Sequence, residues 1–375
     1  MFPLSTLAAQ ALLIGGVSVL MAVMISVIDS IVNNYGDVQL DINGKKQVTV
    51  KGGSKLLGTL ADQGIFLPSA CGGRGSCGAC KCQVKSDVGP HLPTEVPYLT
   101  QQELRENVRL ACQVKVKADI GIEIPEDLFN IKKLSCTVES MTNLTYDIKE
   151  VRLKLPEGSD LTYTAGQYGQ IEVPAYGGIR EPSARAYSFA SAPQEKDTLE
   201  FLIRLVPGGT VTTYVHKFLK VGDKINVVAP VGDFRVHDTQ AAMICVGGGS
   251  GMAPFRSIFR DMEARGVLGE RDIWYFFGGH SVKDLYFMDW LKELEAKYER
   301  FHFIPAVSEP GPGEVWEGKP ARLIDVLAEK FKTEIPRELI KEGYLCGSPG
   351  MLDACMDIMR KNGMTDDKIY FDKFA

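Results

Sequence analysis

A short glycine-rich segment with three cysteines constrains the fold of this chain more than any other feature. It reads Cys71-Gly-Gly-Arg-Gly-Ser-Cys77-Gly-Ala-Cys80, and a fourth cysteine, Cys112, follows 32 positions after Cys80. Four thiolates are what a [2Fe–2S] cluster needs, and a glycine-rich loop can turn its backbone N–H groups toward the sulfurs. The sequence therefore predicts a domain that brings these four cysteines together as metal ligands.

A zinc site is the alternative interpretation of these cysteines. Zinc motifs usually contain two separated C-x2-C pairs, whereas this chain has one such pair and one distant fourth cysteine, which favours a cluster. Cys82 is the surplus thiol and is expected to pack as a small apolar side chain. Nine cysteines are too few and too unevenly placed for a disulfide framework. Four of them within residues 71–82 indicate metal ligation in a reducing compartment.

The first thirty residues have the composition of a membrane anchor. No charged residue occurs from Phe2 to Ile28, and a helix of that length would extend about 40 Å, enough to cross a roughly 30 Å hydrocarbon layer. A cleaved signal peptide would have a basic start and a shorter apolar stretch, and a buried core helix would usually have a polar face. The first basic residues follow the span: Lys45, Lys46, Lys51 and Lys55. This bias predicts a single-pass protein of the inner (plasma) membrane, with its soluble domains in the cytoplasm.

Three further domains are predicted after an anchor at residues 1–33. Residues 34–129 combine a β-hairpin, a short helix capped by Ser54 and the cysteine loop, which makes an α+β domain. Residues 130–239 contain strand after strand and are expected to form an antiparallel β-barrel. Residues 240–375 alternate strands with helices, as in a parallel α/β sheet. The net charge of −5 gives no global basic field, so nucleic acid is not an expected partner.

Two segments of the predicted barrel together indicate a flavin site. Arg185 can pair with a diphosphate, Tyr187 can stack on a flat ring, and Ser188 can hydrogen-bond to that ring. A second segment opens a helix expected near residues 211–219, and its free N–H groups and hydroxyls would form a seat for the same diphosphate. The residues of that seat are Gly208, Gly209, Thr210, Val211, Thr212 and Thr213. The alternative for this second segment is a plain turn with a helix cap.

Two glycine-containing segments of the α/β domain are candidates for binding a dinucleotide. The first follows an apolar strand expected at 241–246, and the second follows a strand at 344–345, at the sheet edge where such folds bind ligands. Neither is a strict G-x-G-x-x-G motif, and no ribose-binding acid follows the strand at 273–277. A buried structural cysteine is the alternative for Cys346. The candidate residues are Gly247, Gly248, Gly249, Ser250, Gly251, Met252 and Pro254, then Cys346, Gly347, Ser348, Pro349 and Met351.

These sites, in this order, resemble the ferredoxin–NAD(P)H reductase family fused to a plant-type ferredoxin. With the anchor, and with five rather than four residues between the first two cysteines, the chain looks like the F subunits of bacterial sodium-translocating NADH:quinone oxidoreductases. The resemblance covers essentially the whole chain. It implies FAD at Arg185, Tyr187, Ser188 and 208–213, and NADH at 247–254 and 346–351. It also implies a nicotinamide ring beside Cys346 and an aromatic cover over the flavin from Phe374.

The resemblance further implies an electron-input subunit. NADH would give a hydride to FAD, with Tyr187 and Ser188 orienting the ring, and single electrons would pass to the [2Fe–2S] cluster. Partners would be the lipid bilayer and other membrane subunits, which reduce ubiquinone with sodium translocation. One alternative is an anchored NAD(P)H reductase that feeds an oxygenase or desaturase. Another is a tethered ferredoxin-like carrier whose reductase part has degenerated, which would bind almost no flavin.

Overall fold

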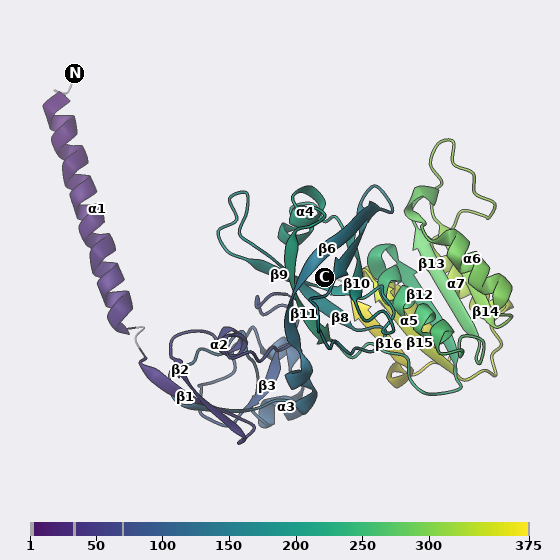
Figure 1. Cartoon of the computed structure of the whole chain (residues 1–375), viewed down its shortest axis with the longest axis horizontal. Helices are drawn as coiled ribbons and strands as arrows, with labels where there is room; N and C mark the ends of the chain where they lie inside the picture. The colour runs from purple at the N-terminus through teal and green to yellow at the C-terminus, as the bar shows by residue number, and fades with distance from the viewer. Residues whose placement is uncertain (1–3, 33–34, 70, 374–375) are drawn as a thin grey trace. The chain divides into compact units, whose positions relative to one another are not determined.

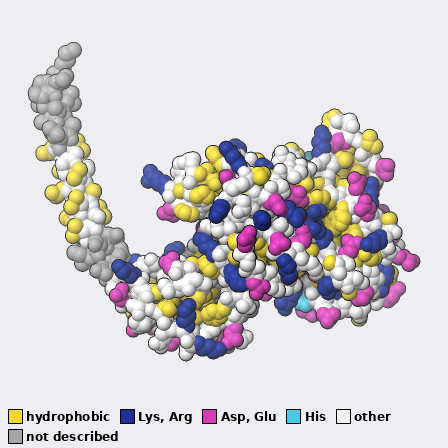
Figure 2. Space-filling view, in the orientation of Figure 1, with side chains coloured by type: hydrophobic (Ala, Val, Ile, Leu, Met, Phe, Trp, Pro, Cys, Tyr) yellow, Lys and Arg dark blue, Asp and Glu magenta, His cyan; other side chains and the backbone are white. Residues whose placement is uncertain are grey.

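The structure is a computed structural model that describes residues 4–32, 35–69 and 71–373 (Figure 1). It contains two compact units, Met1–Phe129 and Asn130–Ala375. The first unit begins with helix α1 (Leu4–Val32). Where its side chains are described, at residues 13–27, they are exposed and largely hydrophobic (Figure 2). Within the described residues, no helix combines the length and the apolar character that crossing a bilayer requires.

The remainder of the first unit is a five-stranded sheet with short helices. Its elements are β1 (Asp37–Ile42), β2 (Lys46–Lys51), α2 (Leu56–Asp62), β3 (Lys81–Val84), η1 (Val96–Tyr98), α3 (Gln101–Arg105), β4 (Val108–Leu110), β5 (Ile120–Glu123) and η2 (Glu126–Asn130). The strand order is β2-β1-β5-β3-β4. The turn at Asn43 and Gly44 joins β1 and β2 as an antiparallel hairpin, and both turn residues have positive φ, which asparagine and glycine tolerate best.

The prediction that Ser54 is the N-cap of helix α2 is wrong. Lys55, not Ser54, occupies the N-cap position, and it makes no side-chain cap. Instead, the N–H groups of Leu56 and Leu57 donate to the carbonyls of Val114 and Ala111. Tertiary backbone bonds thus satisfy donors that a side chain would otherwise satisfy, and they fix α2 against the chain around Cys112.

The second unit begins with an antiparallel sheet. Its elements are β6 (Lys132–Asn143), β7 (Ile148–Lys154), β8 (Tyr168–Val173), β9 (Ser183–Ser188), β10 (Thr198–Arg204), α4 (Thr210–Lys217) and β11 (Lys224–Val231). The strand order is β10-β7-β6-β11-β8-β9. A single isolated bridge between Phe189 and Phe201 joins the two edges. The sheet is therefore a half-barrel, not the fully closed barrel that the strand pattern predicts.

A five-stranded parallel sheet completes the second unit. Its elements are β12 (Ala242–Gly248), η3 (Gly249–Gly251), α5 (Met252–Ala264), β13 (Ile273–Gly279), η4 (Val282–Asp284), α6 (Met288–Lys297), β14 (Phe301–Val307), α7 (Leu323–Thr333), β15 (Lys341–Gly347), α8 (Pro349–Lys361), η5 (Asp366–Lys368) and β16 (Ile369–Lys373). The order is β14-β13-β12-β15-β16. Helices α5 and α6 share a core with one face, and α7 and α8 with the other. The sequence pattern did not predict α7 or β16.

A buried ion-pair network joins the half-barrel to helix α5. Glu200 on β10 is 2% exposed and accepts a hydrogen bond from Arg256 Nε at 2.7 Å. Arg260 and Arg152 lie 3.5 Å and 3.7 Å from the same carboxylate. Beside it, Ser257 Oγ donates to the carbonyl of Ser191 at 2.6 Å. Because α5 begins at the glycine segment, this network positions that segment against the half-barrel.

Candidate functional site

The cysteine loop of the first unit is folded through glycines with positive φ. Gly75 and Gly78 have φ of 78° and 68°, which other residues rarely adopt. Space gives a second reason for glycine: a Cβ at Gly75 would stand 2.4 Å from Gln113 Nε2, and one at Gly78 would stand 2.8 Å from the Tyr98 ring. The loop can therefore pass close to its neighbours only with glycine at these two positions.

The four predicted ligand thiols occur as two pairs. Cys77 Sγ lies 3.4 Å from Cys71 Sγ, and Cys80 and Cys112 are hydrogen-bonded to each other. Within the described part of the chain, no three His, Cys, Asp or Glu side chains stand close enough to hold a metal ion. Cys82 is 2% exposed and belongs to the hydrophobic core, as expected for the surplus thiol.

The environment of two of these thiols, Cys71 and Cys112, favours the thiolate, the form that binds iron, whereas burial raises the pKa of Cys77. Burial opposes ionisation of Cys71, but hydrogen bonds from the Ser76 N–H, from the Cys77 thiol and from the N–H groups of Arg74 and Gly75 outweigh it and lower its pKa to about 7. A hydrogen bond from Cys80 lowers the pKa of Cys112 to about 6, and the same bond raises that of Cys80. A loop that directs several N–H groups at cysteine sulfur has the donor set that fits a [2Fe–2S] cluster.

The first predicted flavin segment lies on strand β9. Arg185 and Tyr187 pair with Ile171 and Gly169 of β8, so the two side chains lie on one face of the sheet. Arg185 Nη1 donates to the carbonyl of Ala184 at 2.6 Å. Burial raises the pKa of Tyr187, so its hydroxyl stays protonated. A guanidinium and a neutral aromatic ring on one face fit a diphosphate and a flat ring.

The second predicted flavin segment forms the start of helix α4. Gly209 is the N-cap, and the first backbone N–H groups of the helix have no acceptor within it, which suits an anion. The Thr212 hydroxyl is not free, contrary to the sequence prediction. It accepts from the N–H of Val206 at 3.2 Å and lies 3.3 Å from the carbonyl of Gly209. Thr212 therefore fixes the turn, and the donors that this segment would offer an anion are its first backbone N–H groups.

The two glycine segments of the α/β domain lie side by side at the carboxyl end of the sheet. Gly247 on β12 is in register with Cys346 on β15. A Cβ at Gly251 would stand 2.2 Å from the carbonyl oxygen of Cys346, and one at Gly248 would stand 2.9 Å from Met351 Sδ. The backbones of the two segments can approach this closely only because glycine has no side chain.

Two details of the first glycine segment differ from the sequence prediction. Strand β12 continues through Gly247 and Gly248, so the turn itself is confined to residues 249–251. Pro254 is the third residue of α5, although its place after the glycines predicts the first helical position. Sequence reasoning also missed Arg204, whose Nη1 lies 3.5 Å from the position of a Cβ on Gly249. Nothing in the sequence near residue 204 marks it, because β10 meets the glycine segment only in the folded chain.

Three side chains from three strands converge beside the second glycine segment. Ser188 Oγ on β9 lies 3.4 Å from Asp372 Oδ2 on β16, and it also hydrogen-bonds to Cys346. Burial raises the pKa of the Cys346 thiol, the Asp372 carboxylate adds to the rise, and Ser188 opposes it. Burial also raises the pKa of Asp372 to about 6, against a smaller effect of Ser188. The Ser188 hydroxyl and the Cys346 thiol are therefore neutral at neutral pH, whereas Asp372 carries a proton only below a pH near 6.

Asp372 is a second residue that sequence reasoning missed. It is in register with Cys346 across β15 and β16, and this pairing exists only in the folded chain. Cys346 itself is fully buried. Its predicted place beside a nicotinamide ring therefore depends on its contacts with Ser188 and Asp372 and not on exposure to solvent. Phe374, predicted to cover the flavin ring, lies outside the described residues.

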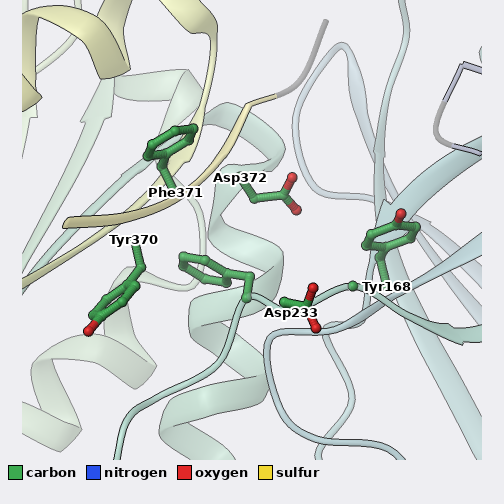
Figure 3. Close-up of a pocket in the computed structure, with 7 residues that line it drawn as sticks. Tyr168, Asp233, Tyr370, Phe371 and Asp372 are labelled. Atoms are coloured by element: carbon green, nitrogen blue, oxygen red, sulfur yellow. The ribbon is translucent and has the colours of Figure 1, made fainter. Parts of the chain in front are cut away.

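A cavity of about 240 Å³ opens beside Asp372. Figure 3 shows the Asp372 side chain pointing toward Asp233 and Tyr168. Tyr168 is in register with Ser188 across β8 and β9, so the cavity adjoins the Ser188–Asp372 pair. Aromatic rings with a few convergent polar groups are typical of a cofactor or substrate site. The lining residues are Tyr168, Gly232, Asp233, Phe234, Tyr370, Phe371 and Asp372.

Family models match three segments of the chain. Residues 40–117 match the 2Fe-2S iron-sulfur cluster binding domain. Residues 135–236 match the oxidoreductase FAD-binding domain, and residues 243–357 match the oxidoreductase NAD-binding domain.

Two relatives match the chain over nearly its whole length. The F subunit of the Na(+)-translocating NADH-quinone reductase of Marinomonas sp. (strain MWYL1) is 38% identical, over 91% of each chain. The F subunit of the same reductase from Serratia proteamaculans (strain 568) is 36% identical, over 96% of this chain and 97% of its own. Among solved structures, the Amycolatopsis cytochrome P450 reductase GcoB has a TM-score of 0.69 at 28% identity and matches 90% of this chain and 98% of its own. The ferredoxin reductase in carbazole 1,9a-dioxygenase has a TM-score of 0.67 at 26% identity, over 91% of this chain and 99% of its own.

Proposed function

Because the chain belongs to the family of F subunits of the Na(+)-translocating NADH-quinone reductase, we propose how its own residues carry out electron input. The chain is an electron-input subunit with FAD-, NAD- and [2Fe–2S]-binding domains, and it is part of a multi-subunit complex. The cofactors predicted from the sequence are thereby confirmed. The assignment of roles to individual residues is our proposal.

When bound, FAD accepts a hydride from NADH and the [2Fe–2S] cluster carries single electrons onward. Arg185 and the first N–H groups of α4 would bind the FAD diphosphate, while Tyr187 would lie against the flavin ring. Thr212 holds the turn before α4 closed through its bonds to Val206 and Gly209, and so keeps those N–H groups aligned.

The two glycine segments would bind NADH. The turn at residues 249–251 and the start of α5 offer N–H donors to the pyrophosphate, and Arg204 adds a positive charge beside Gly249. Residues 346–351 would bind the nicotinamide half. Phe374 follows β16 in sequence and, by resemblance to the family, would cover the flavin ring until NADH displaces it.

The convergence of Ser188, Cys346 and Asp372 is the observation that carries this proposal. Its hydroxyl, neutral thiol and carboxyl would lie between β9, which we propose binds the flavin, and residues 346–351, which we propose bind the nicotinamide. Ser188 Oγ donates a hydrogen bond to Asp372 Oδ2, and the Asp372 carboxyl holds a proton of its own below a pH near 6 and releases it above. The buried Cys346 excludes water from the same spot.

In the first unit, Cys71, Cys77, Cys80 and Cys112 would ligate the cluster. The lowered pKa of Cys71 and Cys112 and the N–H groups of the loop support this ligand set. We also propose that α1 anchors the chain in the inner membrane with the remaining domains in the cytoplasm. Support comes from its uncharged sequence, from its exposed apolar side chains and from the lysines that follow it.

The experiment is to purify the protein from native membranes in mild detergent and to assay NADH-driven quinone reduction with and without sodium. Sodium-stimulated activity with co-purifying membrane subunits is the expected result. A lone protein that reduces only artificial acceptors would overturn it in favour of an anchored reductase for an oxygenase, a function that the likeness to the two oxygenase-associated reductases would then support.

A further inference from the structure

The side chain of Gln113 lies against the cysteine loop and contacts one of the proposed ligands. Its Nε2 donates a hydrogen bond to Cys112 Sγ at 3.4 Å. A Cβ at Gly75 would stand only 2.4 Å from that same nitrogen. The Gln113 amide therefore lies against the loop backbone at Gly75, where a side chain on the loop would occupy the same space.

Thr94 fixes which end of the amide faces the sulfur. Its hydroxyl donates to Gln113 Oε1 at 3.3 Å, which occupies the amide oxygen as an acceptor. A glutamine has two donors on nitrogen and an acceptor on oxygen, so this arrangement directs an N–H, and not the oxygen, at Cys112. The backbone of Gln113 is also held, because its N–H donates to the carbonyl of Leu110 at 2.7 Å.

We propose that Gln113 raises the reduction potential of the [2Fe–2S] cluster through its N–H···S bond to Cys112, and that Thr94 orients it for this purpose. The inference rests on the proposed function, which makes Cys112 a ligand. One-electron reduction, with the electron supplied from NADH through the flavin, adds one negative charge to the cluster and its ligand sulfurs. An N–H donor stabilises that added charge more than it stabilises the oxidised state.

The consequence concerns how readily electrons leave the flavin. The fraction of cluster that is reduced at a given NADH/NAD ratio depends on the cluster potential. Removal of the donor leaves the ligand set intact but shifts this equilibrium toward the oxidised cluster. Gln113 thus acts through Cys112 and not by contact with substrate.

The test uses four variants of the full-length protein and an EPR-monitored redox titration of the cluster. Gln113→Leu removes the donor with little change in size, and we expect about a tenfold shift toward the oxidised state, or about 59 mV for a one-electron couple. Gln113→Glu also adds a negative charge, so its potential should fall further. Thr94→Val should give a smaller fall in the same direction. Gln102→Leu is the matched control and should titrate as wild type, because the Gln102 amide on α3 donates to Glu106 Oε1 at 2.8 Å and not to a ligand sulfur.

Iron and sulfide content, measured on each variant, separates a change of potential from loss of the cluster. A wild-type protein without any [2Fe–2S] signal would overturn the proposed function itself. A wild-type signal with an unchanged potential in Gln113→Leu would overturn only the inference about Gln113. If Gln113→Leu does not assemble a cluster, Thr94→Val decides, and an unchanged potential in that variant overturns the inference.

Discussion

Ser188 Oγ on β9 and Asp372 Oδ2 on β16 lie 3.4 Å apart, although 184 positions separate them in the sequence. The pair links the half-barrel to the last strand of the parallel sheet. It brings a hydroxyl that the sequence marks as flavin-binding into contact with a carboxyl that the sequence does not mark at all. A change at either residue should therefore affect both the stability and the chemistry of this junction.

Replacement of the buried carboxyl should make stability less dependent on pH. Because the pKa of Asp372 in the folded protein is about 6, above its ordinary value, the folded state binds more protons than the unfolded state between about pH 4 and 6. Stability of the wild type therefore falls as pH rises through this window. The flavin-free Asp372→Asn variant should gain up to about 3 kcal/mol over wild type above pH 7, at about 1.4 kcal/mol per pKa unit, and little at pH 4. Thermal unfolding from pH 4 to 8 measures this difference.

Asp160→Asn is the control for that experiment, because Asp160 is exposed. Its stability relative to wild type should not change across the window. An Asp372→Asn variant whose advantage stays constant with pH would mean that folding does not raise the pKa of this carboxyl.

Loss of the Ser188 hydroxyl should slow hydride transfer without loss of FAD. Ser188 is 3% exposed and bonds to both Asp372 and Cys346, so Ser188→Ala removes the group that connects them. We expect flavin reduction by NADH to slow about 100-fold, the usual cost of one preorganised donor, as measured by stopped-flow absorbance. Ser183→Ala, at the other end of β9, should reduce at the wild-type rate. An unaltered rate in Ser188→Ala would remove this hydroxyl from the reaction.

The proposed ligands should separate electron entry from electron exit. Cys77→Ala should abolish the EPR signal of the cluster and electron transfer to quinone, because a cluster needs four ligands. NADH should still reduce FAD in this variant at close to the wild-type rate. Cys82→Ala should keep the cluster, since Cys82 packs in the core. Loss of flavin reduction in Cys77→Ala would mean that electrons do not follow the proposed order.

The sequence predicts those parts of the site whose residues lie close together along the chain. Cysteine spacing, the Arg185–Ser188 segment and the two glycine segments are each local patterns, and they led to the right cofactors and family. Asp372 and Arg204 are different, because each gains its place from a tertiary contact: β16 pairs with β15, and β10 meets the turn at Gly249. No spacing rule connects such positions.

The local rules failed at three places, each for a different reason. Ser54 does not cap α2, because the carbonyls of Val114 and Ala111 already accept its first N–H groups. Thr212 resembles a ligand-binding hydroxyl in sequence, yet it is used to close its own turn. Strand β16 was missed because its sequence, Ile-Tyr-Phe-Asp-Lys, does not alternate clearly between apolar and polar residues.

A methyl group at Gly251 should weaken NADH binding selectively. Its Cβ would stand 2.2 Å from the carbonyl oxygen of Cys346, a backbone atom that cannot move aside without shifting the second glycine segment. Gly251→Ala should raise the KM for NADH about tenfold or more and leave FAD content unchanged. Gly58→Ala on α2 is the matched control, because a Cβ there meets nothing within 4 Å and alanine favours helices. Equal KM values in the two variants would contradict the close approach of the segments.

A buried ion pair should make the [2Fe–2S] domain sensitive to single substitutions but tolerant of a double one. Glu95 and Arg109 are 0% and 2% exposed in their side chains, with 2.7 Å between Oε2 and Nη2. Glu95 also accepts from the N–H groups of Leu92 and Leu110, and Arg109 donates to the carbonyl of Gly89. Removal of one partner leaves an uncompensated buried charge, which typically costs about 3–5 kcal/mol.

Arg109→Met and Glu95→Leu should therefore each lower the urea midpoint at which the cluster absorbance of the full-length protein is lost. The double variant should recover part of that loss, since it removes both charges from the interior. Burial opposes ionisation of Glu95, but hydrogen bonds from Arg109 and from the two N–H groups lower its pKa. The pair thus contributes its full stability above the ordinary glutamate pKa, and that contribution is lost as pH falls through the lowered value. The advantage of wild type over Arg109→Met should then shrink in acid, and additive losses in the double variant would show that the two side chains act independently.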